Sequence, residues 1–174
     1  MFLLDPKKSI DYCVHALEES IKYNQLICSL SYIGQVIFCN LYNLEEIRPI
    51  NVNVNRCIRA LKIIDKEDFL IVAGEKEISD IDINKRIIVF CMKFGFNCEF
   101  NCIYQKKNGN ILITEYGDIC EIKEFHFSEE YQNLNLISSK DKDFTKYITT
   151  IAELDNGDLL VGGYDNYLIV YTKN

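Results

Sequence analysis

The chain contains no tryptophan, no long apolar run and no block of basic residues. Without an apolar run of about 20 residues, no segment is predicted to cross a membrane as a helix. The 19 Lys and Arg residues are scattered and are outnumbered by 26 Asp and Glu, which gives a net charge of −7. Because phosphate binding needs a basic surface, we expect neither nucleic acid nor a membrane as a partner.

Features of a secreted protein are also missing. Residues 1–4 are apolar, but charged residues follow at once, which leaves no room for a signal peptide. No asparagine begins an Asn-x-Ser/Thr acceptor. The eight cysteines could form a disulfide framework, but six of them fall inside short apolar runs: Cys13, Cys28, Cys39, Cys57, Cys102 and Cys120. Since cysteine in such runs behaves as a small hydrophobe, we expect free thiols and a reducing, cytoplasmic compartment.

Metal ligands and catalytic groups are not suggested by any motif. Cys98 and Cys102 are separated by three residues rather than the two of a usual zinc pair, and we expect them to share one strand face as thiols. Residues 155–158 (Asp-Asn-Gly-Asp) lack the alternating oxygen ligands and the bidentate Glu of a calcium loop. His15 is expected in a buried strand and His126 near a loop, with no Ser or Cys motif beside either. We therefore predict no metal, no cofactor and no catalysis.

Four units of the chain repeat one pattern of apolar anchors. Each unit has an apolar run that is followed eleven positions later by another aliphatic residue; the pairs are Leu26 and Ile37, Leu70 and Ile81, Ile111 and Ile122, and Leu159 and Val170. Successive units begin 41 to 48 residues apart. A period in the forties, built from short apolar strands, is typical of a propeller-type array of β-sheet blades.

Within a unit, the pattern predicts three or four antiparallel strands. Asn108-Gly109 and Asn156-Gly157 lie between apolar runs and predict type I′ hairpin turns between strands a and b. Outer fourth strands are expected in the first three units, at residues 47–51, 86–90 and 134–137, and Pro49 restricts the first of these to an edge. The last unit has no fourth strand of its own, although Phe2-Leu3-Leu4 could supply one. The polar run 140–143 is expected to be a solvated loop.

The last unit also resembles a known family. Residues 159–171 (Leu-Leu-Val-Gly-Gly-Tyr-Asp-Asn-Tyr-Leu-Ile-Val-Tyr) resemble the core of a WD repeat, in which an apolar strand runs into a Gly-x-x-Asp turn and a following aliphatic strand ends in an aromatic residue. The resemblance makes Asp165 the turn aspartate and Tyr171 the counterpart of the family's tryptophan. It implies four-stranded propeller blades and a role in protein–protein scaffolding. No unit ends in Trp-Asp, and no Gly-His pair precedes a strand a.

We therefore predict one all-β domain, residues 1–174, made of propeller blades at about 10–52, 56–92, 98–138 and 146–174. A β-sandwich or a small barrel built from the same repeats remains an alternative. The turns between strands b and c should lie on one rim, and aromatic and basic residues there suit protein recognition. These candidate binding residues are Tyr32, Lys76, Tyr116 and Tyr164.

The predicted function is that of a non-catalytic scaffold in a larger assembly. The alternative is a propeller-borne hydrolase or other enzyme with its site at the central channel. A WD-type ring usually needs about seven blades, so four would leave the sheets at both ends of the array uncovered. Closure could come from a small four-bladed ring, from a second copy of the chain, or from another protein. We expect a protein partner or a homodimer to complete the propeller.

Overall fold

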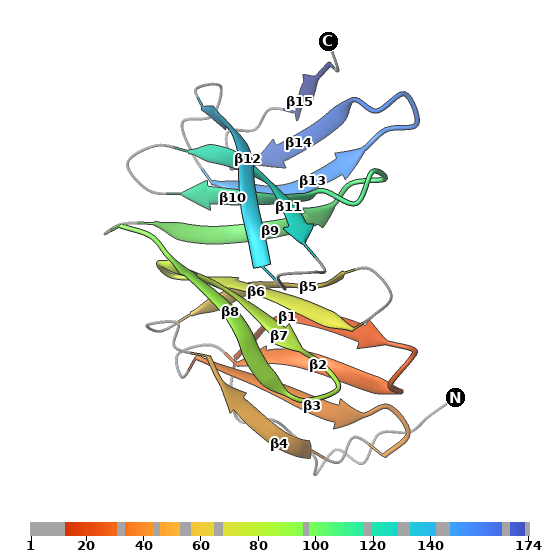
Figure 1. The fold of residues 1–174 in the computed structure, drawn as a ribbon. Helices are drawn as coiled ribbons and strands as arrows, with labels where there is room; N and C mark the ends of the chain where they lie inside the picture. Colours follow the sequence, from red (N-terminus) through yellow and green to blue (C-terminus); the bar gives the residue numbers. More distant parts are fainter. Residues whose placement is uncertain are drawn as a thin grey trace.

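The computed structural model describes residues 13–30, 34–43, 46–52, 57–64, 68–95, 98–116, 120–128, 133–141, 147–164 and 168–172. Within these ranges the regular secondary structure consists of β-strands alone. The strands form four separate antiparallel sheets (Figure 1). The described residues include no helix that could cross a membrane. The all-β blade prediction is confirmed, and the sandwich and barrel alternatives are wrong because each repeat forms a sheet of its own.

Each sheet is a meander in which consecutive strands pair, and we number the sheets as blades 1 to 4. Blade 1 contains β1 (Val14–Ser20), β2 (Gln25–Leu30), β3 (Gln35–Asn40) and β4 (Glu46–Asn51). Blade 2 contains β5 (Ile58–Ile64), β6 (Phe69–Gly74), β7 (Glu77–Asp82) and β8 (Ile87–Lys93). Blade 3 contains β9 (Glu99–Gln105), β10 (Ile111–Tyr116), β11 (Glu121–Ser128) and β12 (Asn133–Asp141). Blade 4 contains β13 (Ile148–Glu153), β14 (Leu159–Gly163) and β15 (Leu168–Tyr171).

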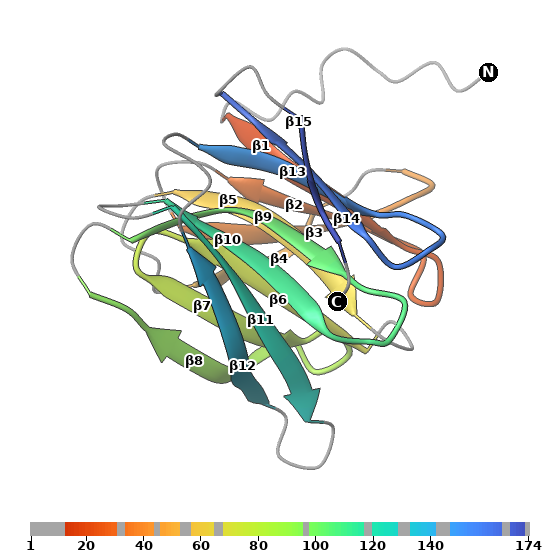
Figure 2. The ribbon, with the colours of Figure 1, turned by 90° about the horizontal axis from the view of Figure 1, so that it is seen from above.

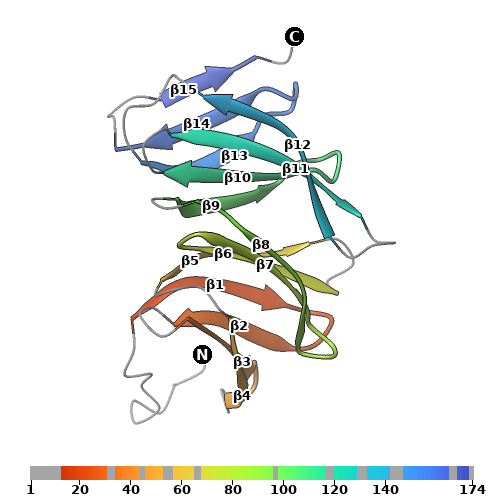
Figure 3. The same ribbon diagram turned by 60° about the vertical axis from the view of Figure 1, so that its left-hand side comes forward.

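The blades are stacked in chain order, so that each packs on the next (Figures 1 and 3). The first strands of neighbouring blades contact one another, β1 with β5, β5 with β9, and β9 with β13. Seen from above, these four inner strands overlie one another on one side of the stack, while the outer strands β8 and β12 lie on the other side (Figure 2). The inner strands thus line the axis from which the blades radiate.

The hydrophobic core lies between blades rather than within one. In β6, Leu70 and Val72 join the core shared with blade 1, whereas Ile71 and Ala73 join the core shared with blade 3. Because both faces of blade 2 are covered, β6 is a continuous apolar run instead of an alternating one. A third core between blades 3 and 4 contains Leu112, Cys120, Ile122, Ile148, Ile151, Leu159 and Val161.

The two Asn-Gly hairpins occur where the sequence predicts them, but their turn type differs. The Lys106 amide donates to the Asn110 carbonyl at 2.8 Å, and the Gly109 amide donates to the Lys106 carbonyl at 2.9 Å. Gly109 has φ of 86°, whereas Asn108 is not among the described residues with positive φ. The loop is therefore a three-residue turn closed by a glycine bulge. Gly157 repeats this geometry, and the type I′ prediction is wrong at both sites because a third residue enlarges each loop.

The outer strands follow the prediction with one correction. β12 pairs with β11 as far as Asp141, which lies opposite Glu121, and Lys140 lies opposite Ile122. These two residues of the expected solvated loop are thus part of a strand. In blade 4 the described residues form three strands. Phe2-Leu3-Leu4, the suggested source of a fourth, lies outside the described residues.

Candidate functional site

Every inner strand carries a β-bulge near its beginning. In β5, Ile58 pairs with Gly74 and Ala60 with Ala73, which leaves Arg59 as the extra residue. The same comparison of paired residues identifies Asn101 as the extra residue in β9 and Thr149 in β13. In β1 the extra residue is His15 or Ala16. A bulge redirects the side chain of the unpaired residue. The repeat therefore delivers one redirected side chain per blade to the same level of the central axis.

These redirected side chains line one cavity beside the axis of the blade array, which we call the channel mouth. Its volume is about 390 Å³ and its walls are His15, Arg59, Asn101, Tyr147, Thr149 and Tyr164. His15 is exposed there, so the expectation that it lies in a buried strand is wrong. The cause is that β1 is the innermost strand of the first blade and its side chain at this level faces the channel. His126 lies in β11, is exposed, and has Nδ1 3.4 Å from Oδ1 of Asn110.

The polar groups of this cavity are only partly paired. Arg59 Nη2 lies 2.9 Å from Glu99 Oε2, which joins blades 2 and 3 by an ion pair. Arg59 Nε and Asn101 Nδ2 are buried and have no acceptor within the part of the chain that the structure describes. The Thr149 hydroxyl donates to the Gly162 carbonyl at 3.5 Å. The cavity therefore contains two hydrogen-bond donors without an acceptor among the described residues.

Two of the lining residues, Tyr147 and Tyr164, belong to a cluster of three tyrosines. The rings of Tyr116 and Tyr147 stack with centroids 3.6 Å apart, and Tyr147 meets Tyr164 edge to face at 5.6 Å. A hydrogen bond to Tyr116, followed by burial, raises the pKa of Tyr147. Tyr116 ends β10 in blade 3, whereas in blade 4 Tyr147 precedes β13 and Tyr164 follows β14. The cluster thus joins blades 3 and 4 on this rim.

The sequence predicts two of these three residues. Tyr116 and Tyr164 are brought together, but they meet through Tyr147, which sequence reasoning missed. Tyr147 directly precedes strand β13, and the segment before a strand a lies on the same rim as the turn between strands b and c in an antiparallel meander. Searching both kinds of connection for aromatic residues would have found it.

The other candidate residues lie elsewhere. Lys76 is half-buried with φ of 62°; its amide donates to the Cys98 carbonyl at 2.9 Å, and its carbonyl accepts from the Phe94 amide at 2.8 Å. It is not among the residues that line the channel cavity. Tyr171 packs half-buried on the core between blades 3 and 4. Tyr32 and Asp165 lie outside the described residues, so their roles stay predictions.

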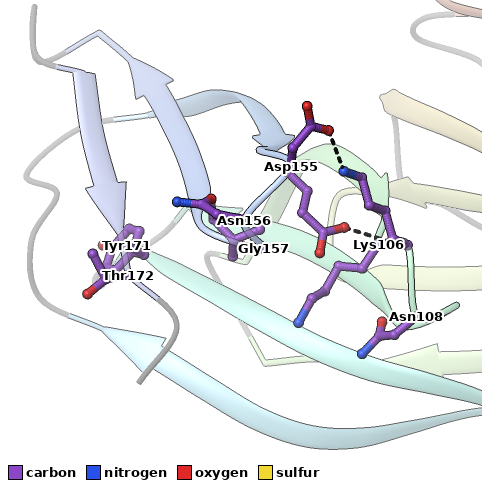
Figure 4. A pocket seen from close by; sticks show the side chains of 10 residues that line it. Lys106, Asn108, Asp155, Asn156, Gly157, Tyr171 and Thr172 are labelled. Atoms are coloured by element: carbon purple, nitrogen blue, oxygen red, sulfur yellow. Dashed lines mark hydrogen bonds and ion pairs between the residues drawn. The ribbon is translucent and has the colours of Figure 1, made fainter.

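A second cavity, of about 410 Å³, lies between the Asn-Gly turns of blades 3 and 4 (Figure 4). Its two lysines are each paired with a carboxylate. Lys107 Nζ lies 2.9 Å from Asp155 Oδ1, and the Lys107 amide donates to Glu153 Oε2 at 2.6 Å. Lys106 Nζ lies 2.9 Å from Glu124 Oε1. Because the lysine charges are already paired, this region serves as a contact that joins blades 3 and 4.

No metal site emerges from the described residues, among which no group of three or more His, Cys, Asp and Glu could hold an ion. Cys98 packs on the core between blades 2 and 3, whereas Cys102 packs on the core between blades 3 and 4. The expected shared face is wrong because the bulge at Asn101 inverts the strand alternation between them. Burial, followed by a hydrogen bond to Glu115, raises the pKa of Cys98 to about 11, which disfavours the thiolate that metals and electrophiles require.

Comparison with known proteins finds no matching protein-family model and no matching curated protein. Solved structures do match. The WD40 β-propeller domain of Doa1 superposes with a TM-score of 0.69 and 19% identity, over 95% of this chain and 53% of that one. The fold is that of a WD40 propeller. A chain from a mitotic checkpoint complex gives a TM-score of 0.77 and 14% identity, over 91% of this chain and 50% of that one. The WD40 fold described here spans about half the length of each neighbour.

Proposed function

We propose that this chain is a non-catalytic protein-interaction scaffold that recruits a further β-sheet surface to the exposed face of blade 4. The observation that supports the proposal is the exposure of Leu168 and Val170 in β15, at 66% and 50%. Both are strand residues, and both are large and apolar. In a propeller such side chains pack against the next blade.

The strand register defines this face. Leu168 pairs with Gly162, and Val170 pairs with Leu160, so these four residues share the side of the sheet that is turned away from blade 3. Leu159 and Val161 occupy the opposite side and are buried in the core with blade 3. Leu160 and Leu168 correspond by register to Leu112 and Ile122 of blade 3, which are buried beneath blade 4. Blade 4 therefore carries the apolar positions that receive a neighbouring blade.

The other end of the array differs. Leu30, Ile37 and Cys39 lie on blade 1 and are only 2%, 3% and 5% exposed. Val14 and Leu17 of β1 are exposed. The expectation that both end sheets are uncovered alike is therefore wrong for the outer part of blade 1. The proposal accordingly places the main docking surface on blade 4.

Binding is also the chemistry that the channel mouth supports. Its residues supply hydrogen-bond donors and aromatic faces, and its one basic ring, His15, has no Ser or Cys nucleophile beside it among the lining residues. The arrangement favours the scaffold over the propeller-borne enzyme, because catalysis of hydrolysis requires a positioned nucleophile or water together with a base.

Light scattering tests the docking surface. The parent chain, of 20.3 kDa, should associate with a second copy at micromolar concentration or co-purify with a protein partner. Leu168→Asp should abolish that association because it places a charge on the docking face. Ile87→Asp is the matched control, since Ile87 is also 50% exposed on a strand but lies in blade 2. A parent chain that stays a stable monomer and captures no protein would contradict the proposal.

We also place the protein in a reducing, cytoplasmic compartment. All eight cysteines are free in the structure, and Cys13 and Cys91 are exposed. Burial, followed by Cys39, raises the pKa of Cys28 to about 12, which keeps that thiol protonated. Titration of thiols in denatured protein that was purified without reductant should find eight. Fewer, with disulfide-linked peptides in a digest, would contradict the assignment.

A further inference from the structure

Two buried donors at the channel mouth have no hydrogen-bond partner in the part of the chain that the structure describes. Arg59 Nε and Asn101 Nδ2 both belong to residues that line the cavity, and neither finds an acceptor among the described residues. Buried donors without an acceptor are uncommon in native proteins, and each needs an explanation. Both residues occupy strand bulges, so the backbone directs their side chains toward the cavity.

The local charge limits what this cavity can accept. Glu99 already neutralises Arg59 across 2.9 Å, and the two side chains are only about one-third exposed. An incoming carboxylate would meet the negative charge of Glu99, and an incoming ammonium group would meet Arg59. Like charges in a partly dry site repel strongly. An uncharged acceptor, such as a peptide carbonyl, satisfies the donors without that cost.

The aromatic side of the cavity restricts the class of ligand further. Tyr164 is 64% exposed, and its neighbour Tyr147 is held in place by the stack with Tyr116. Rigid tyrosine faces are good surfaces for a flat apolar ring. Proline offers such a ring and is preceded by a tertiary amide whose carbonyl remains free in an extended helix. Grooves that combine aromatic faces with carbonyl-binding donors recognise this kind of segment.

We infer that the channel mouth binds an uncharged, proline-rich segment of a partner protein, with a proline ring against Tyr147 and Tyr164 and a backbone carbonyl on the Arg59 and Asn101 donors. The inference rests on the scaffold function proposed above, but it uses a different surface from the apolar face of blade 4. The segment enters at the rim where Tyr164 is exposed. Tyr147, which stacks on Tyr116, forms the wall behind it.

Titration of the whole chain with blocked synthetic hexapeptides tests this inference. Hexaproline, acetylated and amidated, should shift the side-chain amide resonances of Asn101 and the backbone resonances near Tyr164. Blocked hexaglutamate and hexaalanine should leave them unchanged. Absence of a hexaproline shift at these residues would overturn the inference, and so would tighter binding of hexaglutamate, which would indicate an anion site instead.

Variants separate recognition from folding. Tyr164→Ala should weaken hexaproline binding at least about tenfold, as expected for an anchoring aromatic residue, while Tyr164→Phe should retain it. Tyr42→Ala is the matched control, because Tyr42 is 80% exposed in the turn that follows β3, on the opposite rim. Equal losses in Tyr164→Ala and Tyr42→Ala would overturn the inference.

Two further variants isolate the donors and the scaffold. Arg59→Lys keeps a positive charge beside Glu99 but removes Nε, and it should weaken hexaproline binding several-fold. An unchanged affinity would contradict the role of that donor. Leu168→Asp should abolish association through blade 4 and leave hexaproline binding intact. Association that persists in Leu168→Asp would contradict the blade 4 proposal alone, whereas a parent chain that associates but binds no hexaproline would overturn the channel-mouth inference alone.

Discussion

A methyl group on Gly163 would lie only 2.0 Å from the carbonyl oxygen of Tyr147. The two residues meet where β13 begins and β14 ends, and the amide of Tyr164 donates to the same carbonyl at 3.0 Å. This close approach of two backbones brings Tyr147 and Tyr164 into edge-to-face contact. Gly163 thus permits the contact between Tyr147 and Tyr164, although it is not itself part of the tyrosine cluster.

Gly163→Ala should therefore destabilise blade 4 and disorganise the channel mouth. The added methyl group meets backbone, which cannot rotate away, and overpacking of this kind costs about 1–3 kcal/mol of unfolding free energy. Gly162→Ala is the control, because its methyl group would meet only side chains, Thr150 at 3.2 Å and Leu168 at 3.8 Å. Urea unfolding of both variants measures the difference. Equal losses would contradict the backbone clash.

Asp80 should make the stability of the protein depend on pH. It is 0% exposed in the core between blades 2 and 3, opposite Ile71 and Phe90 in the neighbouring strands. Burial raises the pKa of Asp80 to about 7; the Ile81 amide offsets this only in part, and Asp82 adds to it. Above its ordinary pKa the unfolded chain releases this proton first, so the free energy of unfolding falls as pH rises until the folded pKa is passed.

One pKa unit corresponds to about 1.4 kcal/mol, so this single group should cost about 4 kcal/mol between pH 4 and pH 8. Asp80→Asn cannot ionise and should be more stable than the parent at pH 8, with little difference near pH 4. Urea unfolding at both pH values measures the change. Asp155→Asn is the control. The Lys107 side chain lowers the pKa of Asp155, so the contribution of Asp155 to the pH dependence of stability has the opposite sign to that of Asp80. A parent and an Asp80→Asn variant with parallel pH profiles would contradict the assignment.

The sequence predicts the blades well because both faces of a middle blade are buried. Continuous apolar runs such as β6 therefore recur at the repeat period and can be recognised without a structure. The eleven-residue spacing, however, locates strands b and c but not their pairing: Leu70 lies opposite Ile81, whereas Leu159 lies opposite Tyr171. Differences in turn length shift the register from blade to blade.

The site was harder to predict for a related reason. One extra residue in each inner strand turns Arg59, Asn101 and Thr149 toward the channel, and a bulge has no apolar signature in the sequence. The same irregularity defeated the prediction that Cys98 and Cys102 share a face. Strict alternation along a strand is a reliable guide only where the ladder is unbroken.

The glycine bulges of the two Asn-Gly hairpins give a third prediction. Gly157 has φ of 86°, a region that disfavours any residue with a Cβ. Gly157→Ala should lower the unfolding free energy by about 1–2 kcal/mol. Gly95→Ala is the matched control, because Gly95 is not among the described residues with positive φ and an added methyl group there would meet no atom within 4 Å. Thermal unfolding of both variants distinguishes them, and an equal effect would indicate that the turn tolerates a Cβ.

The ion pair between Arg59 and Glu99 should couple blades 2 and 3 energetically. Nη2 and Oε2 are 2.9 Å apart, and both side chains are about one-third exposed, so solvent screens the pair in part. A double-mutant cycle of Arg59→Met and Glu99→Gln should give a coupling of about 0.5–1 kcal/mol that diminishes in high salt. The pair of Lys107 and Asp155 is the comparison, because both side chains are exposed and no measurable coupling is expected there. Since the two pairs join successive blades at similar N–O distances, the cycles differ mainly in solvent exposure. A larger coupling at Lys107 and Asp155 would show that burial does not set the strength of these inter-blade contacts.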